Sequence, residues 1–211
     1  MRSNNTAIKE ALQQLARQDD DIARALNAYG YPRDRSMTQS FESLAKIIIG
    51  QQISRIVATS IWNRLDEAGW TSASAISRLD CAALKTKGLS LRKAEYIKGL
   101  AIAIEDGSLN LAQLPNLTGD EVQARLTALR GIGAWTADNY RLFALGDMDA
   151  WPGNDMALQE GMKRLKNMAY RPELKEMNKL AESWSPYRGA GALFLWHLYA
   201  AEVRSATPSE I

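Results

Sequence analysis

The chain of 211 residues carries 26 Lys and Arg against 24 Asp and Glu, for a formal net charge of +2. This length allows a substantial buried core without a disulfide or a metal to stabilise it. One cysteine, Cys81, and one histidine, His197, exclude an intramolecular disulfide, a Cys/His zinc site and a four-cysteine iron–sulfur cluster. Any chemistry must therefore come from carboxylates, lysines, hydroxyl groups and the backbone, and so small a net charge does not by itself indicate a nucleic-acid partner.

Two segments bear on the compartment of the protein. Residues 1–26 are amphipathic and partly acidic, without the apolar stretch or cleavage site of a signal peptide. The longest apolar run, residues 190–201, is well short of the roughly 20 residues that cross a bilayer. The sequence therefore predicts a cytoplasmic protein, associated with the nucleoid in a bacterium, that does not enter a membrane.

Apolar side chains recur at helical spacing along almost the whole chain, and no segment alternates apolar and polar residues convincingly. We therefore predict an all-α fold of short helices joined by Gly and Pro turns, with residues 1–35 packing against the C-terminal helices. A capping-box pattern, Thr118 to Glu121, marks one helix start. The predicted helices, in chain order, cover residues 41–50, 57–69, 79–84, 92–104, 118–131 and 134–145, and two more contain residues 156–162 and 193–198.

The connection Gly131-Ile132-Gly133 separates two of these helices. Glycines spaced in this way let the backbone adopt positive φ and bring successive N–H groups close to a ligand, while the second helix points its positive end outward. A DNA phosphate suits this arrangement, whatever base it carries. The alternative is an ordinary turn between helices with a glycine cap, which the motif alone does not exclude.

The segment Leu126–Ala137 resembles the hairpin of the helix-hairpin-helix (HhH-GPD) DNA glycosylases. Asp149-Ala-Trp-Pro-Gly-Asn-Asp155 follows it as the Gly/Pro-rich loop and catalytic aspartate of that superfamily do. Residues 41–54, which end in Gly-Gln-Gln-Ile-Ser, and residues 184–196 resemble two further segments. The likeness covers residues 38–200 and is strongest to 3-methyladenine DNA glycosylase II, the AlkA type.

This resemblance implies a bilobal helix-hairpin-helix glycosylase fold without an N-terminal sheet domain and without an iron–sulfur cluster. It implies one domain of two lobes, a central lobe of residues 38–140 and a remaining lobe of residues 1–37 and 141–211. Bifunctional members, which also cut the strand, have a lysine nucleophile in the place that Trp135 fills here. The substitution argues against Schiff-base chemistry and favours a monofunctional hydrolase.

The resemblance assigns catalysis to Asp155. Cleavage of an N-glycosidic bond builds positive charge on the deoxyribose, which a fixed carboxylate can stabilise while it orients or deprotonates water. An Asp after Pro-Gly-Asn and before a helix is also an excellent N-cap, and the two roles are compatible. We interpret Asp149 and Arg188 as structural, and assign no role to Cys81 or His197.

A base inside duplex DNA is out of reach of a carboxylate, so the nucleotide must be flipped out and the gap in the stack filled. By family position Gln52 is the candidate wedge, and a helix-capping amide is the alternative. Trp135 and Tyr187 match pocket-lining positions, where their rings would suit a cationic base; either could instead be core. Asn139 stands in the pocket where one branch of the family has an aromatic residue.

Further DNA contacts are expected from two places. Arg92 and Lys93 begin a helix after the Gly88-Leu-Ser turn and resemble part of the DNA-facing surface of the family, although solvated surface charge is the alternative for each. The hairpin contributes four residues, Gly131, Ile132, Gly133 and Thr136.

Together these features predict a monofunctional DNA glycosylase of base excision repair that removes alkylated purines such as 3-methyladenine and 7-methylguanine. Its expected partner is damaged double-stranded DNA, and we expect a monomer without a cofactor or a metal. Two alternatives stay open at this point. One is a non-catalytic helix-hairpin-helix module that only binds DNA, and the other is a glycosylase for other damaged or mismatched bases.

Overall fold

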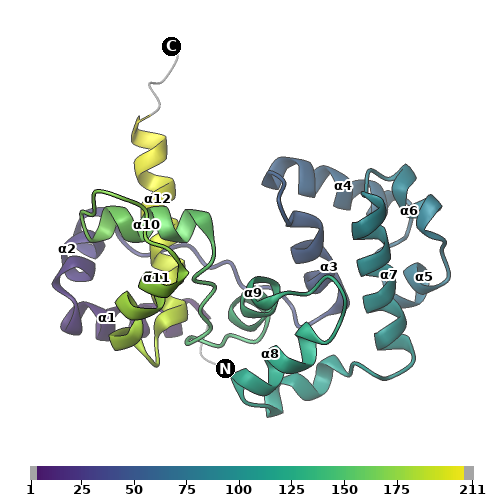
Figure 1. The fold of residues 1–211 in the computed structure, drawn as a ribbon, viewed down its shortest axis with the longest axis horizontal. Helices are drawn as coiled ribbons and strands as arrows, with labels where there is room; N and C mark the ends of the chain where they lie inside the picture. Colours follow the sequence, from purple (N-terminus) through teal and green to yellow (C-terminus); the bar gives the residue numbers. More distant parts are fainter. Residues whose placement is uncertain (1–3, 207–211) are drawn as a thin grey trace. The chain divides into compact units, whose positions relative to one another are not determined.

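A computed structural model describes residues 4–206, and every regular element in that range is helical. The prediction of an all-α fold is therefore confirmed. The elements are α1 (Asn4–Gln18), α2 (Asp20–Tyr29), α3 (Phe41–Gly50), α4 (Arg55–Glu67), α5 (Ala73–Ser77), α6 (Cys81–Thr86), α7 (Leu91–Glu105), the 3₁₀ helix η1 (Leu111–Asn116), α8 (Gly119–Thr127), α9 (Ala134–Ala144), α10 (Met156–Leu165), α11 (Leu174–Leu180), η2 (Glu182–Trp184) and α12 (Arg188–Ala206). Figure 1 shows them in order. Among residues 4–206, no helix has the length and apolar character of a membrane span.

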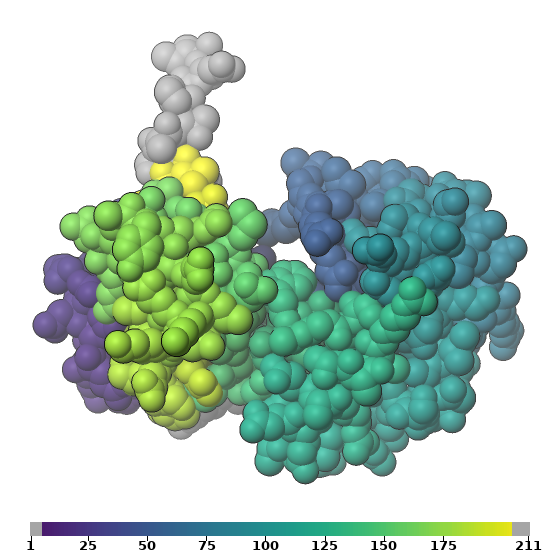
Figure 2. All heavy atoms as spheres, viewed as in Figure 1, coloured from purple at the N-terminus to yellow at the C-terminus, as the bar shows by residue number. Residues whose placement is uncertain are grey.

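The chain divides into two compact units. The terminal unit consists of Met1–Ser36 and Gly146–Ile211, and the central unit of Met37–Leu145. In Figure 2 the purple N-terminal atoms and the green and yellow C-terminal atoms gather in one body, and the blue and teal atoms form the other. The sequence placed the second lobe boundary after residue 140, whereas the structure places it after Leu145, because α9 continues without a break to Ala144.

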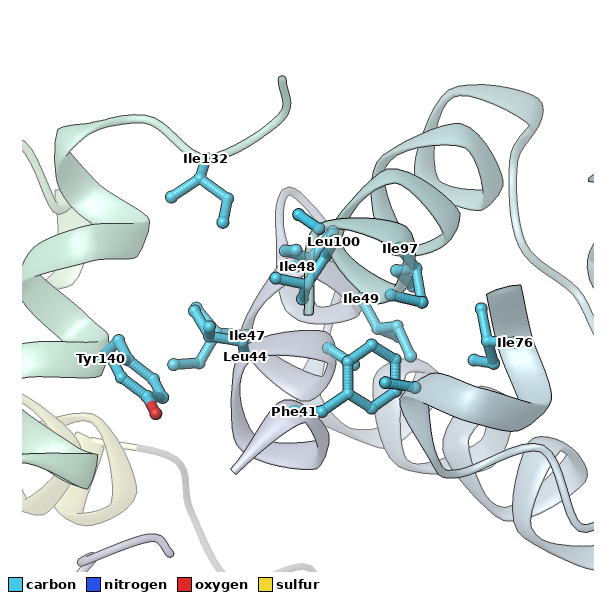
Figure 3. Close-up of a cluster of buried hydrophobic side chains, with 14 of the residues drawn as sticks. Phe41, Leu44, Ile47, Ile48, Ile49, Ile76, Ile97, Leu100, Ile132 and Tyr140 are labelled. Carbon is cyan, nitrogen blue, oxygen red and sulfur yellow. The ribbon is translucent and has the colours of Figure 1, made fainter. Parts of the chain in front are cut away.

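Helix α3 is the centre of the central unit. It starts where Ser40 caps it by accepting a hydrogen bond from the N–H of Ser43 at 3.3 Å. Its apolar residues face several directions and are buried against α4, α7 and α9, as expected of a helix that is hydrophobic around most of its circumference. Figure 3 shows Leu44 and Ile47 on the side of Tyr140, and Ile49 on the side of Ile76. Helix α3, predicted as residues 41–50, is thus the core against which the rest of this unit packs.

Several predicted helix ends were wrong. The predicted helix 79–84 begins at Cys81, because Asp80 accepts a hydrogen bond from the N–H of Ala83 at 2.7 Å and acts as the N-cap. Helix α8 ends at Thr127 rather than at Gly131, so the connection to α9 is longer than predicted. The capping box of α8, from Thr118 to Glu121, forms as the sequence indicated.

In the terminal unit, α1 and α2 pack with the C-terminal helices. The main polar link is the ammonium of Lys166, which donates to both carboxylate oxygens of Asp19 at 2.8 and 2.7 Å and to Asp21 at 2.9 Å. The indole N–H of Trp184 also donates to Asp19, at 2.9 Å. Burial raises the pKa of Asp19, but the hydrogen bonds from Lys166 and Trp184 outweigh it and hold that pKa below its ordinary value. The N-terminal and C-terminal segments of the terminal unit are therefore joined by ionised groups as well as by apolar contacts.

Candidate functional site

The hairpin between α8 and α9 contains two glycines with different environments. Gly131 has φ +92°, and a Cβ on it would lie 2.1 Å from the ring of Tyr96. Gly133, the N-cap of α9, has an ordinary φ of −92°, and a Cβ on it would meet no atom of the protein within 4 Å. The fold therefore requires glycine at position 131 but not at 133. A ligand that approaches the backbone closely would explain the second glycine.

Helix α9 has no side-chain cap, because its N-cap is Gly133. The first N–H groups of a helix have no acceptor inside it, and together with the helix dipole they favour an anion. Gly133 and Ala134 are both exposed, whereas Ile132 between the glycines is buried in the core of the central unit. The arrangement can accept a phosphate through backbone groups, and Ile132 serves as the apolar anchor of the turn.

The Gly-Gln-Gln turn after α3 is fastened to this hairpin. The side-chain amide of Gln51 donates to the carbonyl of Gly131 at 3.0 Å and to the hydroxyl of Thr136 at 2.9 Å. The whole of Thr136, backbone included, is only 1% exposed. Thr136, one of the DNA contacts expected from the hairpin, is thus buried, and its hydroxyl bonds Gln51.

Lys93, also expected to contact DNA, points inward. Its ammonium donates to the carbonyls of Ile49 and Gln51, both at 2.7 Å, and thereby satisfies carbonyl groups at the end of α3. Burial lowers the pKa of Lys93. The neighbouring Arg92 is exposed. Among the two cations at the start of α7, Arg92 is therefore the one available to a phosphate, and Lys93 is part of the framework.

Gln52, the candidate wedge, is exposed and has φ +57°. A residue with a Cβ rarely adopts this left-handed backbone, and it persists only where the surrounding structure imposes it. Here the preceding residue, Gln51, is held through both its carbonyl and its side chain. The turn therefore presents the side chain of Gln52 to the outside on a constrained backbone.

The expected pocket residues fall in both units. Trp135, in the first turn of α9, is half-buried, and Asn139 is only 4% exposed. The amide of Asn139 donates to the carbonyl of Trp135 at 2.6 Å, a bond within α9. Tyr187, in the terminal unit, lines a cavity of about 490 Å³ together with Met148 and residues of α1. The amide N–H that Asn139 uses inside its own helix is not offered to a base in this arrangement.

Asp155 is the N-cap of α10, and its carboxylate has a defined orientation. Its Oδ1 accepts one hydrogen bond from the backbone N–H of Leu158 at 2.9 Å and another from the indole N–H of Trp196, in α12, at 3.0 Å. The guanidinium of Arg35 lies 5.9 Å from the centre of the Trp196 ring. The N-cap predicted from the sequence is present, and a tryptophan that the sequence did not single out helps to fix it.

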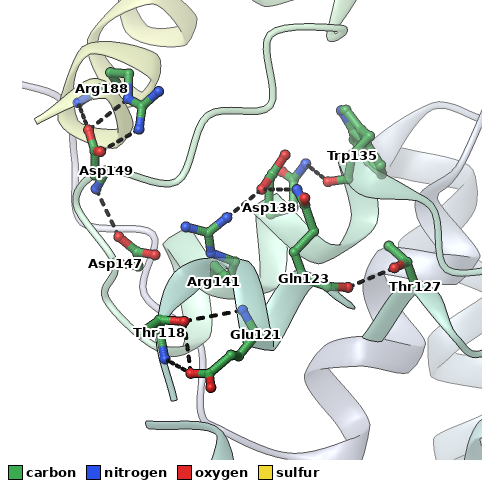
Figure 4. Close-up of polar contacts among 11 residues, drawn as sticks. Thr118, Glu121, Gln123, Thr127, Trp135, Asp138, Arg141, Asp147, Asp149 and Arg188 are labelled. Atoms are coloured by element: carbon green, nitrogen blue, oxygen red, sulfur yellow. Dashed lines mark hydrogen bonds and ion pairs between the residues drawn. The ribbon is translucent and has the colours of Figure 1, made fainter. Parts of the chain in front are cut away.

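The loop before Asp155 is held to the start of α12 by Asp149. This carboxylate accepts hydrogen bonds from the backbone N–H of Arg188 at 3.1 Å and from its guanidinium at 2.9 and 2.5 Å (Figure 4). It accepts another from the hydroxyl of Ser185 at 3.1 Å. Burial raises the pKa of Asp149, but its bonds to Arg188 outweigh it and keep the pKa below the ordinary value. These contacts support the structural role predicted for Asp149 and Arg188.

A second attachment holds the same loop. The indole N–H of Trp151 donates to Asn178 at 3.1 Å, and its ring packs edge-on against Trp184 with 5.9 Å between the ring centres. A Cβ on Gly153 would lie 2.5 Å from the Trp151 indole nitrogen, so this glycine is needed for the close packing of the loop on itself. The backbone leading to Asp155 is thus fixed at several points within the terminal unit.

The structure assigns the expected residues to the two units as follows. The central unit carries the expected hairpin, wedge and surface residues together with two pocket residues, and the terminal unit carries Asp155 and Tyr187. Among the described residues, no group of three or more His, Cys, Asp or Glu side chains could hold a metal ion. Sequence reasoning missed Gln51 and Trp196. The only available signal for Trp196 was that a tryptophan in a buried helix needs an acceptor for its indole N–H.

Comparison with known proteins gave matches along most of the chain. The family model described as HhH-GPD superfamily base excision DNA repair protein matches residues 45–186. The putative DNA-3-methyladenine glycosylase YfjP of Bacillus subtilis is 30% identical over 74% of this chain and 58% of its own length. This chain thus spans little more than half of that relative. DNA-3-methyladenine glycosylase 1 of Schizosaccharomyces pombe is 27% identical over 90% of this chain and 87% of its own.

Solved structures agree with these matches. The S. pombe 3-methyladenine DNA glycosylase Mag1, in complex with abasic DNA, superposes with a TM-score of 0.84 at 26% identity, covering 94% of this chain and 100% of that one. The DNA-3-methyladenine glycosidase of Bacillus halodurans gives a TM-score of 0.78 at 28% identity, covering 92% and 91% of the two chains.

Proposed function

Because the chain belongs to the HhH-GPD superfamily of base excision DNA repair proteins, we propose that it is a monofunctional DNA glycosylase that hydrolyses the N-glycosidic bond of alkylated purines such as 3-methyladenine and 7-methylguanine. The observation that carries the proposal is the carboxylate of Asp155, held by a backbone N–H and an indole N–H at the start of α10. Relatives named as DNA-3-methyladenine glycosylases support the substrate class. The tryptophan at position 135, where bifunctional relatives carry a lysine, supports hydrolysis without strand cleavage.

The chemistry assigned to Asp155 is electrostatic. As the bond from C1′ to the purine nitrogen breaks, its electron pair leaves with the base and positive charge develops on the deoxyribose. The carboxylate stabilises this charge and accepts a proton from the water whose oxygen bonds to C1′. An alkylated purine that is already cationic leaves as a neutral base, so no separate acid is required. The products are the free base and an abasic site.

Recognition of the DNA backbone is assigned to the central unit. The N–H groups at the start of α9 bind a phosphate without reading a base, and Arg92 adds a second backbone contact. Gln52 fills the gap left when the damaged nucleotide is flipped out. Trp135 and Tyr187 stack on the flipped base, whose positive charge their rings attract. We propose that the protein acts in this way as a monomer on damaged double-stranded DNA in the cytoplasm.

A non-catalytic DNA-binding module is the main competing function. It would need the hairpin but gain nothing from a carboxylate fixed by two donors, and a negative charge near DNA would oppose binding. A glycosylase for other damaged bases would use the same Asp155 and differ only in which base it releases. Both alternatives are outcomes of the experiment below.

The test is release of free base from duplexes that carry 3-methyladenine or 7-methylguanine, by the wild type and by Asp155→Asn. Asparagine is also a good N-cap, so Asp155→Asn should unfold like the wild type. It should release base at about a hundredth of the wild-type rate or at a lower rate. The wild-type product should be an uncut abasic strand. Binding without release by the wild type would favour a module or another lesion, and equal release by the variant would remove Asp155 from catalysis.

A further inference from the structure

We propose that Gln51 and Lys93 are positioning residues that lock the Gln52 turn to the hairpin, so that binding of a phosphate and insertion of Gln52 occur in a fixed register. The inference rests on the proposed function, because it assigns a task to the wedge and the phosphate grip of the same site. It also explains two side chains that point into the protein from a surface expected to face DNA.

Lys93 fixes the turn from the side of α7. Its ammonium bonds the carbonyls of Ile49 and Gln51 at 2.7 Å each, so it spans the last turn of α3 and the first residue after it. Burying an ammonium costs free energy unless it is paired with acceptors, and two carbonyls at this distance offset part of that cost. The carbonyl of Gln51 precedes the peptide that leads into Gln52. Lys93 thereby holds the backbone immediately before the wedge.

Gln51 fixes the same turn from the side of the hairpin. Its side-chain NH₂ group donates to Gly131 at 3.0 Å and to Thr136 at 2.9 Å, one acceptor in the connection and one in α9. Gly131 is in turn packed so closely on Tyr96 that even a Cβ would not fit. Because Tyr96 and Lys93 belong to one helix, α7, the turn, the hairpin and α7 form a closed set of contacts.

This closed set accounts for the backbone of Gln52. A left-handed φ of +57° is unfavourable for a residue with a Cβ, so without its supports the turn would relax to other conformations. The wedge would then have to be ordered when DNA binds, which costs free energy at that moment. In the locked turn this cost has already been met during folding. Gln51 and Lys93 should therefore matter more for damaged DNA, where the wedge inserts, than for intact DNA.

The experiment measures the affinity of each variant for a duplex with a tetrahydrofuran abasic analogue and for the undamaged duplex of the same sequence. Gln51→Glu keeps the size of the side chain and removes its N–H donors, and Lys93→Met keeps the length and removes the ammonium. Each should reduce the preference for the abasic duplex on the order of tenfold, the scale of one lost charge-assisted hydrogen bond for Lys93 and of two lost neutral hydrogen bonds for Gln51. Lys98→Met, on the same helix and without a described role in the turn, is the matched control for charge and should keep the preference.

Combination with Gln52→Ala makes the test specific. If the two residues act through the wedge, adding either substitution to Gln52→Ala should lower the preference no further. Fully additive losses, or equal losses of affinity for both duplexes, would overturn the proposal. Circular dichroism and thermal melts check that each variant folds. If Lys93→Met does not fold, the result for Gln51→Glu decides whether the proposal holds. A wild type that prefers abasic DNA but releases no base would contradict the proposed function and leave this inference standing.

Discussion

Replacement of Trp196 by phenylalanine isolates the orientation of the Asp155 carboxylate, which we propose to be catalytic. The change removes the indole N–H that bonds Asp155 at 3.0 Å and leaves an aromatic ring in place for Arg35. A hydrogen bond to a charged group is worth about 1.5–3 kcal/mol, which corresponds to roughly tenfold to hundredfold in rate if it is lost only in the transition state. Because the N–H of Leu158 still bonds the same oxygen at 2.9 Å, we expect the lower end, about tenfold.

The assay is base release from a 7-methylguanine duplex under single-turnover conditions, with the affinity for the duplex measured separately. Trp151→Phe is the matched control, since it removes the same kind of donor, an indole N–H, from the loop before Asp155 but leaves Asn178, not Asp155, without its bond. Both variants should unfold at similarly reduced temperatures, and only Trp196→Phe should slow the chemical step with little change in affinity. Equal slowing by the two variants, or no slowing by Trp196→Phe, would refute the argument that this indole orients the carboxylate.

Four further predictions concern particular positions. Gly131→Ala should lower the free energy of unfolding by about 2–5 kcal/mol in chemical denaturation, because the methyl group would clash with the Tyr96 ring and the residue would keep a positive φ. Gly133→Ser, at an N-cap position with open space around it, should keep the free energy of unfolding and weaken binding to undamaged duplex about tenfold in filter binding. Tyr140→Phe should raise the free energy of unfolding by about 1 kcal/mol in urea titrations, since the buried hydroxyl has no hydrogen-bond partner among the described residues; a lower stability would contradict this. The pKa of Asp149 is lower in the folded than in the unfolded protein. Its stabilising effect is therefore complete above the unfolded pKa and is lost as the pH falls through the folded pKa. Thermal melts of Asp149→Asn should show a weaker loss of stability on acidification than those of the wild type.

Features that depend on neighbouring residues in the chain were predictable from the sequence. The capping box at Thr118, the helix 41–50 and the N-cap at Asp155 all follow from local spacing, and the structure contains each of them. The end of α8 was not predictable in the same way, because Thr127 and Gly131 are both compatible with a helix end and packing decides between them.

The orientation of polar side chains was the feature that the sequence revealed least. Lys93 and Thr136 were expected to contact DNA, but their partners are 44 and 85 residues away in the sequence, Ile49 for the lysine and Gln51 for the threonine. A pattern of charges on a helix identifies a face and does not say whether a long side chain turns back to satisfy a carbonyl. Trp196 was missed for a related reason, since in an apolar helix it is indistinguishable from core until its indole finds an acceptor.

The two carboxylates of the loop show how the surroundings separate roles that the sequence presents alike. Asp149 bonds the guanidinium of Arg188 through both of its oxygens, so most of its charge is already neutralised and its contribution is to hold the loop. Asp155 accepts hydrogen bonds from a backbone N–H and an indole N–H, two neutral donors that orient its carboxylate. A developing positive charge on a sugar is stabilised more by the second kind of group than by the first. Asn at position 149 should therefore leave the rate of base release per folded molecule unchanged, whereas Asn at position 155 should abolish most of it while the fold persists.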